Sequence, residues 1–596
     1  MALATAGTGA PFGPTFNFSF DIAPETGYGV MNMQDQGSGS FLAVAGSLTV
    51  TAGSDAGTYP LYPGGPGITT SPDNAFQYDD LVTPLSSPPL DVEGLLFRNA
   101  ATSFEINIWG NTPGNYSYYN FTPGPGYGTT LTESGTFTTS TAPGGGVTFP
   151  AKFVFNVNAA PSCANDYVAI GIPAAPASGG QANIVGVNNL YAGGAGALCP
   201  TGPTVMFAYA SGTGEVPASV ALARNGKQVF YIENLLTGSS YFHALTLGTT
   251  GTNGTSATAA VVPGASGGNN AVDERVLLSP NGGTTNQSST TAAWVVYGNN
   301  DSTDYAYVTT YSPSGTGSGY LYKISGLNGT PTITWSAAIN AIPSTPTYDL
   351  VTNKVFFTDS NGRVDYLLDS GSSPTVTYGP VVASGATSQN PVIIDNTHAM
   401  VYATFNSNGS NAVVVQEPES LASSVSAAVG SVSTLYTSPY EPDFNNAWYT
   451  GTGTPLLYIA GNGTGSLPTL YSVGFNASGV MNSSAGSTTA ALATGTADSA
   501  PVTEFYNSTL GEDFLFAAVT NDCVATTSGG TAGCIMSLNI TSGFPTVGAS
   551  TVALAATGGA TGIIVDNNSS ATQASSVYYG TKTGGTLVKA TQSALK

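Results

Sequence analysis

Histidine, cysteine and carboxylate side chains are the groups in this sequence that could carry catalysis or bind a metal ion. The chain of 596 residues has two histidines, His243 and His398. They lie in separate parts of the chain with no His-x-x-His spacing, which argues against a zinc or copper site. We predict that His243, in the strand-like run 241–246, and His398, in the turn 395–399, make local structural hydrogen bonds.

The four cysteines form two pairs that are close in sequence, Cys163 with Cys199 and Cys523 with Cys534. Each pair flanks a segment rich in Gly, Ala or Ser. Four cysteines allow three pairings, of which this local one is the simplest. A metal site would need further Cys or His nearby, and the sequence has none there. We predict two disulfide bonds, and hence an oxidising compartment.

Acidic residues form four local clusters that could bring two carboxylates together: Asp79 with Asp80, Asp301 with Asp304, Asp359 with Asp365, and Glu417 with Glu419. A glycosidase needs two such groups facing each other across roughly 5–10 Å. Segment 359–365 matches part of a calcium loop but lacks the remaining oxygen ligands and the closing Glu. Because Asx residues also cap β-turns, we predict turn roles for most of these residues, with weak calcium binding as the alternative. No cofactor is expected.

Residues 264–268 read Gly-Ala-Ser-Gly-Gly and formally match the Gly-x-Ser-x-Gly nucleophile elbow. That motif requires a strand before it and a helix after it. Here it lies in a loop rich in Gly and Asn, and a chain with 76 glycines produces such matches by chance. We therefore predict no catalytic residues and no enzymatic activity.

The charge of the chain excludes several classes of partner. Charged residues make up 7% of the sequence and the formal net charge is −22, whereas an ordinary soluble domain is about 25% charged. With so few Lys and Arg, nucleic acid is excluded as the main partner and docking on anionic lipid is disfavoured. No apolar run is long enough to span a membrane. Because repulsion among the carboxylates eases as the pH falls, we expect good tolerance of acid.

The elements that must position these residues are predicted to be strands. The 76 Gly and 37 Pro argue against helices, while 31 Tyr and 25 Phe provide enough apolar surface for a folded core. Short apolar runs alternate with turn clusters along the chain, so we predict an all-β protein. Segment 420–429 is the one stretch that could form a short helix.

Residues 1–146 are predicted to form a β-sandwich domain, which ends at the Gly-rich stretch 141–146. Its expected strands are 15–22, 41–51, 92–97, 103–109 and 131–139. In one of them Phe104, Ile106 and Ile108 alternate with polar residues and should share one face. Residues 1–97 contain no Lys or Arg. Strand 15–22 therefore either completes its own sandwich or pairs with another subunit, head to tail, in a filament.

Residues 147–596 are predicted to form a β-propeller. A unit of three short strands, the second rich in aromatic residues, recurs about eight times at roughly 40–70 residues, the range of propeller blades. Clear copies occupy 346–368 and 389–415. One unit could be a false split, so seven and eight blades both stay open. The rival is a solenoid, but the first and last units lack polar caps.

The propeller segment resembles a known superfamily. Residues 319–335, followed by Ser344-Thr-Pro-Thr and 355–359, resemble blades of the pyrroloquinoline-quinone-type propellers. The wider pattern from 160 to 567 resembles secreted propeller proteins of environmental bacteria with no assigned activity.

Enzymes of that superfamily, as the resemblance implies, use a vicinal cysteine pair, a stacking tryptophan and calcium. The cysteines here are not adjacent, and the tryptophans are expected in strands or at strand edges: Trp109, Trp294, Trp335 and Trp448. The resemblance thus implies the fold without the cofactor site.

The N-terminal segment, with residues 46–51 and 89–97, resembles the β-rich domain of bacterial exported PEP-CTERM-type proteins. Residues 589–596 form no apolar helix, so the sorting tail of that family is missing. No basic residue precedes Arg98, so we expect no complete signal peptide in this chain. The resemblance implies an exported, extracellular protein.

Together these observations predict a secreted, non-catalytic structural or adhesive protein. Its expected partner is a second copy of itself, in a homo-oligomer or filament, or an extracellular glycan, because uncharged hydrogen-bonding groups and tyrosines dominate the surface. The alternative is a carbohydrate-binding or carbohydrate-active propeller that uses aromatic platforms and carboxylates in its central channel.

Overall fold

The computed structural model of the chain forms two compact units, one from the described residues up to 140 and one from those after 148. The structure describes residues 15–22, 25–37, 40–64, 68–72, 76–82, 93–99, 102–112, 115–121, 130–133, 136–140, 149–154, 161–192, 197–200, 202–235, 238–249, 252–264, 270–298, 301–312, 318–371, 374–384, 386, 390–432, 440–463, 467–525, 532–556, 558–567, 575–582 and 587–591.

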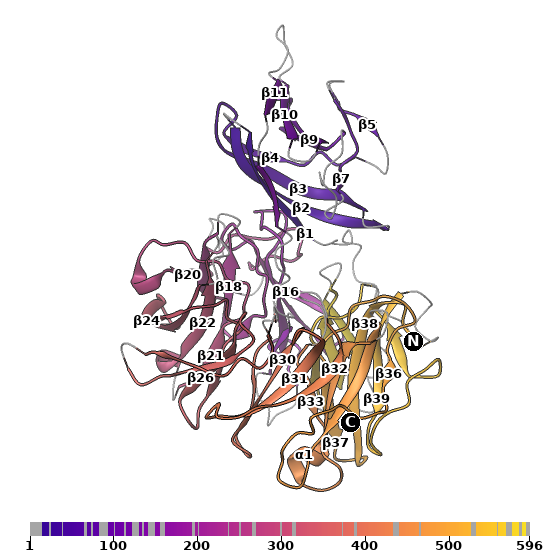
Figure 1. Ribbon diagram of the computed structural model, residues 1–596. Coiled ribbons are helices and arrows are strands. Elements are labelled where there is room, and N and C mark those ends of the chain that lie inside the picture. Colours follow the sequence, from indigo (N-terminus) through magenta and orange to yellow (C-terminus); the bar gives the residue numbers. More distant parts are fainter. Residues whose placement is uncertain are drawn as a thin grey trace. The chain divides into compact units, whose positions relative to one another are not determined.

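The first unit consists of two antiparallel sheets (Figure 1). The larger has the order β12-β1-β2-β3-β4 with β7 paired to β3, the smaller has the order β11-β10-β9-β8, and β5 pairs with β6. The strands are β1 (Thr15–Ile22), β2 (Glu25–Gly37), β3 (Ser40–Ala52), β4 (Gly57–Pro60), β5 (Thr69–Thr70), β6 (Gln77–Tyr78), β7 (Leu81–Val82), β8 (Leu95–Asn99), β9 (Phe104–Thr112), β10 (Asn115–Phe121), β11 (Thr130–Glu133) and β12 (Thr136–Ser140).

One apolar core joins the two sheets, as a sandwich requires. Leu48 and Val50 of β3 pack with Ile106 and Ile108 of β9. The predicted alternation in β9 is therefore present, with Phe104 packed against the same core. Its opposite face is also covered, since Glu105 is buried and lies 3.1 Å from the Arg98 guanidinium.

Two predictions for this unit need correction. The expected strand 131–139 is two strands, β11 and β12, which belong to different sheets. Strand β1 is an interior strand, because it pairs with β2 along one edge and with β12 along the other. The alternative that this strand pairs with another subunit is therefore wrong, because both of its edges are paired within its own sheet.

The second unit is a β-propeller, and its described residues form eight blades of antiparallel strands. Within each blade the strands follow the order of the sequence, and innermost strands of several adjacent blades contact one another. In Figure 1 the blades follow one another from magenta through orange to yellow. The eight repeat units of the sequence correspond to these eight blades.

The strands are, for blade 1, β13 (Ala151–Phe153), β14 (Tyr167–Gly171), β15 (Ile184–Asn188) and β16 (Thr204–Tyr209); for blade 2, β17 (Ala221–Leu222), β18 (Gln228–Asn234), β19 (Ser240–Thr246) and β20 (Val272–Leu277); for blade 3, β21 (Trp294–Val296), β22 (Tyr305–Tyr311), β23 (Gly319–Ser325) and β24 (Thr332–Ile339); and for blade 4, β25 (Thr347–Asp349), β26 (Lys354–Thr358), β27 (Val364–Leu368) and β28 (Val376–Tyr378).

They are, for blade 5, β29 (Ile393–Asp395), β30 (Met400–Phe405), β31 (Asn411–Pro418) and β32 (Val425–Ser431); for blade 6, β33 (Asp443–Phe444), β34 (Leu456–Asn462), β35 (Pro468–Gly474) and β36 (Ala490–Ala491); for blade 7, β37 (Thr503–Asn507), β38 (Glu512–Asn521), β39 (Ala532–Asn539) and β40 (Ala553–Ala555); and for blade 8, β41 (Ile564–Asp566), β42 (Ser576–Gly580) and β43 (Leu587–Thr591).

Helical structure is confined to short turns in the described residues: 3₁₀ helices η1 (Pro280–Gly282) and η2 (Asp301–Thr303), and α-helix α1 (Asn446–Thr450). The helix considered for 420–429 is wrong, because Val425–Ser431 is the outer strand β32. The described part of the chain has no helix that is long and apolar enough to cross a membrane.

Asx turns connect the innermost strand of a blade to the next strand. The Oδ1 atom of Asp349 accepts the N–H of Val351 at 2.8 Å, and Asp395 Oδ1 accepts that of Thr397 at 2.9 Å. Asn507 makes the same contact in blade 7. A short polar side chain at this position replaces the missing strand partner of the turn, which explains why the inner strands β25, β29 and β37 end in Asp or Asn.

The first and last blades close the ring. Val168 and Tyr191 of blade 1 share a buried cluster with Tyr578 of blade 8. At the innermost strands, Lys152 Nζ lies 2.9 Å from Asp566 Oδ2, and both side chains are almost fully buried. The propeller is therefore a closed ring and not an open array.

We expect Lys152→Met to lower the free energy of unfolding by about 3 kcal/mol, because it removes the cation from a buried carboxylate. Chemical denaturation followed by tryptophan fluorescence measures the loss. The matched control is Lys227→Met, at an exposed lysine of blade 2, which should change stability by less than about 0.5 kcal/mol. Equal effects of the two substitutions would show that Lys152–Asp566 does not hold the ring closed.

Candidate functional site

The chemically reactive side chains of the propeller gather at the joints between neighbouring blades. A polar contact crosses each joint between the eight described blades. In blade order from 1–2 to 8–1 these contacts are Gly214–Glu233, Arg224–Gly298, Lys323–Asp369, Lys354–Glu419, Trp448–Asp395, Asn446–Asp513, Lys582–Asp498 and Lys152–Asp566.

His243 lies fully buried on β19, on the side of blade 2 that faces blade 1. Its Nε2 is 2.9 Å from Glu233 Oε2, and its Nδ1 is 2.8 Å from Asp273 Oδ1. Because a carboxylate faces each ring nitrogen, both nitrogens donate and the ring is an imidazolium. Burial lowers the pKa of His243, but the bonds to Asp273 and Glu233 outweigh burial and raise it overall.

Glu233 connects this histidine to the chain that enters blade 2. Its Oε1 accepts the backbone N–H groups of Thr213 at 2.5 Å and Gly214 at 2.6 Å. Burial raises the pKa of Glu233, yet the bond to His243 and the charge of His243 bring it down to about 2. The nearby Ser211 hydroxyl bonds to Asp273 and Tyr231, so this serine is not paired with the imidazole as a nucleophile.

Tryptophans also belong to joints. Asp369 of blade 4 accepts bonds from three groups of blade 3: Lys323 Nζ at 2.6 Å, Tyr307 OH at 2.5 Å and Trp335 Nε1 at 3.3 Å. Trp335 is only 5% exposed. It therefore anchors a blade and offers no face on which a ring-shaped cofactor could stack.

His398 lies in the Asx turn of blade 5, as its sequence predicts, with Nδ1 2.6 Å from Asp395 Oδ2. The same oxygen accepts the Trp448 Nε1–H at 3.1 Å. Trp448 is in helix α1, not in a strand or at a strand edge as expected. The Trp448 contact ties blade 5 to blade 6, whereas the His398 contact stabilises the turn within blade 5.

The carboxylate pair Asp359 and Asp365 comes together in blade 4, with both residues fully buried. Burial raises the pKa of both groups, and the charge of Asp359 raises that of Asp365 further. Asp359 Oδ1 accepts the N–H groups of Asn361 at 2.9 Å and Arg363 at 3.0 Å. The segment is thus a turn whose oxygen atoms face backbone donors. In the described residues no group of three or more His, Cys, Asp or Glu is placed to hold a metal ion.

The remaining predicted clusters are not brought into a shared cleft. Asp80 accepts the N–H of Gly64 at 2.7 Å and that of Leu96 at 3.0 Å, and burial raises its pKa to about 7. Asp304 accepts the N–H of Gly298 at 2.7 Å. Glu417 is buried with neither carboxyl oxygen hydrogen-bonded. Residues 265–268 of the Gly-x-Ser-x-Gly match lie outside the described residues.

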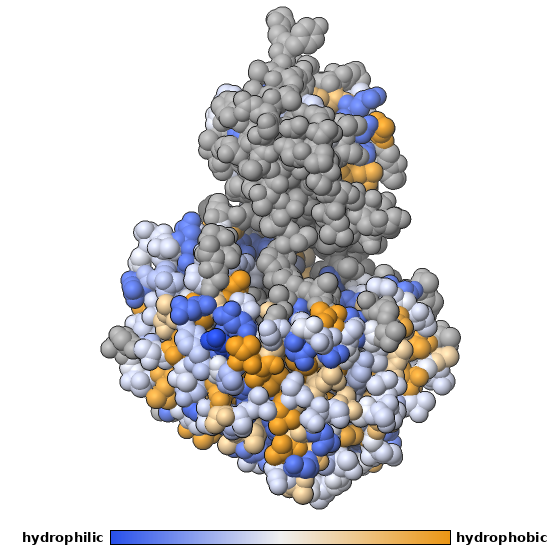
Figure 2. All heavy atoms as spheres, viewed as in Figure 1, coloured by the Kyte–Doolittle hydropathy of each residue, from blue (hydrophilic) through white to orange (hydrophobic). Residues whose placement is uncertain are grey.

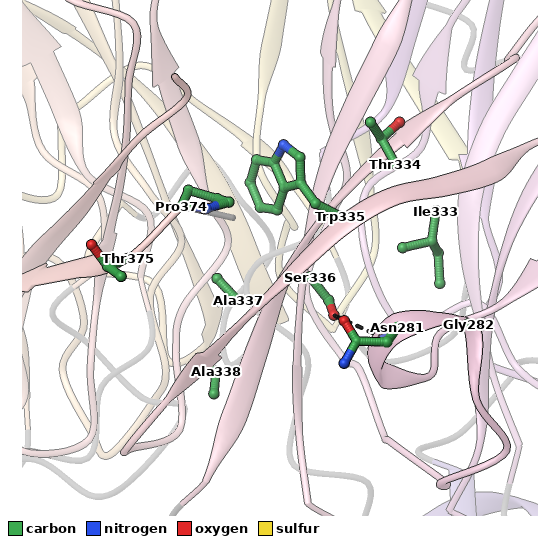
Figure 3. Close-up of a pocket in the computed structure, with 10 residues that line it drawn as sticks. All are labelled: Asn281, Gly282, Ile333, Thr334, Trp335, Ser336, Ala337, Ala338, Pro374 and Thr375. Atoms are coloured by element: carbon green, nitrogen blue, oxygen red, sulfur yellow. Dashed lines mark hydrogen bonds between the residues drawn. The ribbon is translucent and has the colours of Figure 1, made fainter. Parts of the chain in front are cut away.

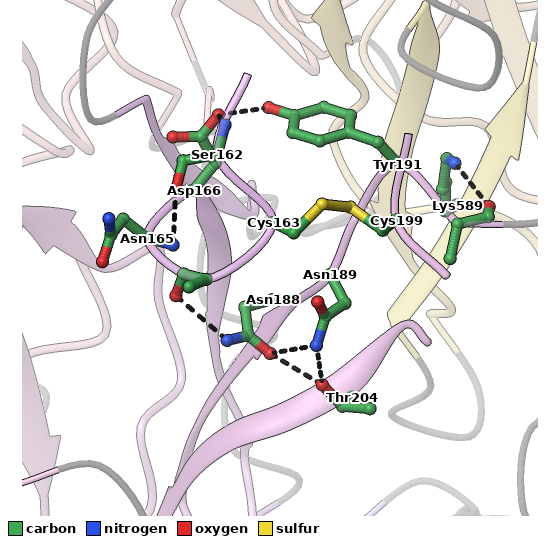
Figure 4. The surroundings of a disulfide bond; sticks show 12 residues. Ser162, Cys163, Asn165, Asp166, Asn188, Asn189, Tyr191, Cys199, Thr204 and Lys589 are labelled. Atoms are coloured by element: carbon green, nitrogen blue, oxygen red, sulfur yellow. Dashed lines mark hydrogen bonds between the residues drawn. A yellow bond between two sulfur atoms is a disulfide. The ribbon is translucent and has the colours of Figure 1, made fainter. Parts of the chain in front are cut away.

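The two disulfide bonds join Cys163 to Cys199 and Cys523 to Cys534, with Cα–Cα distances of 5.7 and 5.8 Å. In blade 1, the first links the connection before β14 to the connection after β15 (Figure 4). The second closes the connection between β38 and β39 in blade 7. Each bond therefore fixes the loops of one blade.

A shallow groove of about 500 Å³ runs along the outer strand β24. Residues 333–338 of β24, Asn281 and Gly282 of η1, and Pro374 with Thr375 form it (Figure 3). Ser336 Oγ accepts the backbone N–H of Asn281 at 2.9 Å. None of the described residues that line the groove is ionisable, and Asn281, Ser336 and Thr375 provide hydrogen-bonding groups there.

Exposed apolar side chains follow several innermost strands on one face of the propeller, which we call the turn face. Tyr449 is 65% exposed, and Leu350 and Val351 are each 71% exposed. Tyr297, Tyr506 and Leu510 complete the set. Because the innermost strands of a propeller all run in one direction, these positions lie on the same face. Exposed apolar residues mark an interaction surface where they form a contiguous patch.

Comparison with solved structures finds proteins that are similar to this chain at low sequence identity. No protein-family model matches the sequence, and no curated protein matches it. BamB from Moraxella catarrhalis is 12% identical with a TM-score of 0.37, over 70% of this chain and 94% of BamB. Sqt1 from Chaetomium thermophilum is 12% identical with a TM-score of 0.42, over 72% and 93% of the two chains. The C-terminal WD40 domain of Sif2 is 9% identical with a TM-score of 0.34, over 59% and 75%.

We expect replacement of either cysteine pair by serine to lower the free energy of unfolding by about 2–4 kcal/mol. The Cys163–Cys199 bond spans 36 residues and the Cys523–Cys534 bond spans 11. The longer closed loop restricts the unfolded chain more, so its loss should cost about 1 kcal/mol more. Denaturation of the two serine variants measures this difference, and mass spectrometry of non-reduced peptides checks the pairing. Free thiols in the mature protein would contradict both expectations.

Proposed function

We propose that this protein is a non-catalytic extracellular structural protein that associates with further copies of itself through the outer strands of its propeller blades. The observation that carries the proposal is the lack of charge on those strands. Among the described outer strands, β16, β24, β28, β32, β36 and β40 contain no charged residue, whereas β20 does, as does β43, the last described strand of blade 8, which contains Lys589. Two of the uncharged strands are partly paired on their outer side, β16 with residues 253–261 and β32 with β34 of blade 6. Soluble proteins usually protect such open edges with charged residues.

Apolar side chains at these outer positions support the same proposal. Val381 beside β28 is 51% exposed and Val552 beside β40 is 67% exposed, with Tyr378 and Val432 in comparable places. In the space-filling view, apolar and weakly polar residues alternate over much of the described surface (Figure 2). With few charges to keep copies apart, edge-to-edge contact costs little desolvation.

Two further observations support an extracellular location. Disulfide bonds persist mainly in oxidising compartments, and all four cysteines are paired. The sequence also resembles secreted propellers of the pyrroloquinoline-quinone type and exported PEP-CTERM-type proteins. We infer a structural role that depends on a stable fold and a large contact area and involves no catalytic turnover.

Sedimentation velocity at increasing protein concentration tests the proposal. The double variant Tyr378→Lys with Val552→Lys places charge on two outer edges and should shift the distribution towards the monomer. Leu350→Lys, on the turn face, is the matched control and should leave it unchanged. A wild-type protein that stays monomeric at millimolar concentration would overturn the proposal. If only Leu350→Lys reduced association, the interface would lie on the turn face and not on the outer strands.

The second candidate function is carbohydrate binding at the turn face, favoured by its exposed tyrosines. Tyr297, Tyr449 and Tyr506 present aromatic rings to solvent among Asn, Ser and Thr side chains. Aromatic faces of this kind stack on the apolar faces of sugars. A glycan array should show binding that Tyr449→Ala weakens at least tenfold, whereas Leu510→Ala, an apolar truncation on the same face, changes it less. Absence of any glycan signal for the wild type would exclude this candidate.

A further inference from the structure

Three carboxyl groups meet at the joint between blades 6 and 7: Asp443 of β33, Glu504 of β37 and Asp513 of β38. Asp443 Oδ2 accepts the backbone N–H of Glu504 at 2.8 Å. Asp513, which is 5% exposed, accepts the N–H of Asn446 through Oδ2 at 2.9 Å. Each blade thus contributes a backbone donor to a carboxylate of the other, and the carboxyl groups lie inside the interface.

The geometry of the joint favours a bound proton. Glu504 and Asp513 lie on the same face of the β37–β38 pair, because Asp513 is opposite Tyr506, two residues along the strand from Glu504. Two ionised carboxylates have only acceptors, so a contact between these groups needs a proton on one of them, which then donates. Glu504 Oε1 and Asp513 Oδ1 are buried, with no hydrogen-bond partner among the described residues. If both Glu504 and Asp513 were ionised, each charge would be removed from water and would repel the other.

The described surroundings of Glu504 offer no compensating cation. Asp443 on β33 and Asp513 on β38 are the charged groups that act on it, and both disfavour its ionisation. From blade 6, helix α1 contributes Tyr449, an uncharged phenol whose side chain is 65% exposed. Strand β34 contributes Tyr458, fully buried, with its hydroxyl unpartnered beside Asp513. Burial, the bond to Asp513 and the two negative charges raise the pKa of Glu504 far above its ordinary value.

We propose that a single proton shared between Glu504 and Asp513 holds blades 6 and 7 together, and that its loss in alkaline solution loosens this joint. The contact between these two blades therefore depends on protonation. It suits the protein to acidic and neutral surroundings.

The direction of the pH dependence follows from linkage. A carboxyl group with a higher pKa in the folded chain than in the unfolded chain binds its proton more tightly when folded. Its stabilising contribution is therefore present at low pH and is lost as the pH rises through the folded-state pKa. Other buried carboxyl groups act in the same direction, because burial raises the pKa of Glu417 and of Glu441 to about 7.

The test compares proton linkage in the wild type and in Glu504→Gln, which keeps the hydrogen-bond donor without an ionisable group. A proton held only by the folded state raises the unfolding constant tenfold per pH unit, over a range from about pH 6 to about pH 9. We plot the logarithm of the unfolding constant against pH for each protein. The slope equals the number of protons released on unfolding, and we expect it to be larger by one in the wild type than in Glu504→Gln. Contributions of groups that do not interact with Glu504 cancel in this difference.

Two further variants make the outcome decisive. Asp513→Asn removes the charge that holds the proton and should also reduce the slope. Glu512→Gln, at the neighbouring residue of β38, is the matched control and should keep the wild-type slope. At pH 9, amide hydrogen exchange in residues 441–446 and 503–515 should be faster in the wild type than in Glu504→Gln. Equal slopes and equal exchange in these two proteins would overturn the proposal, whatever their absolute stabilities.

Discussion

Packing between neighbouring blades is the interaction on which the propeller depends, because each four-stranded sheet has two apolar faces and no other place to bury them. The core of the unit is accordingly divided into clusters that each join two blades. Phe356 of blade 4 packs with Val401 and Val413 of blade 5, and Tyr458 of blade 6 with Leu515 of blade 7. Polar contacts at the same joints fix the alignment of neighbouring blades, because apolar packing alone permits several alignments.

The scarcity of cations gives these joints an unusual composition. Lys323, Lys354 and Lys582 each reach from one blade to a neighbour, as Lys152 does at ring closure. Where no lysine or arginine is available, the chain uses a tryptophan N–H or a protonated carboxyl group instead. Several described side chains with catalytic potential, such as His243 and Asp369, are thus hydrogen-bonded within the framework.

Local patterns predicted most of the fold, because period-two alternation and turn residues act over a few positions. Strand 15–22 and the propeller, with seven or eight blades, were predicted in this way. The pairing partner of strand 15–22 was not predictable, since β12 lies more than a hundred residues away in the sequence. The polar contacts at the joints could not be predicted for the same reason. Glu233, His243 and Asp273 come from three strands, and nothing in their spacing distinguishes them from solvent-exposed polar residues. The recurrent Asp or Asn at the end of inner strands was the one available signal, and it indicates turns.

Ring closure also sets the order in which the propeller can be completed during synthesis. Lys589 of β43 bonds to the carbonyl oxygen of Ala192, a contact that spans 397 residues. Contacts of such sequence separation carry a large loop-closure cost and form late. Until blade 8 has emerged from the ribosome, blade 1 and blade 7 each present an uncovered apolar face. A nascent chain of this kind stays prone to association with its neighbours until its final strands arrive, so chaperone access during translation becomes a condition for good yield.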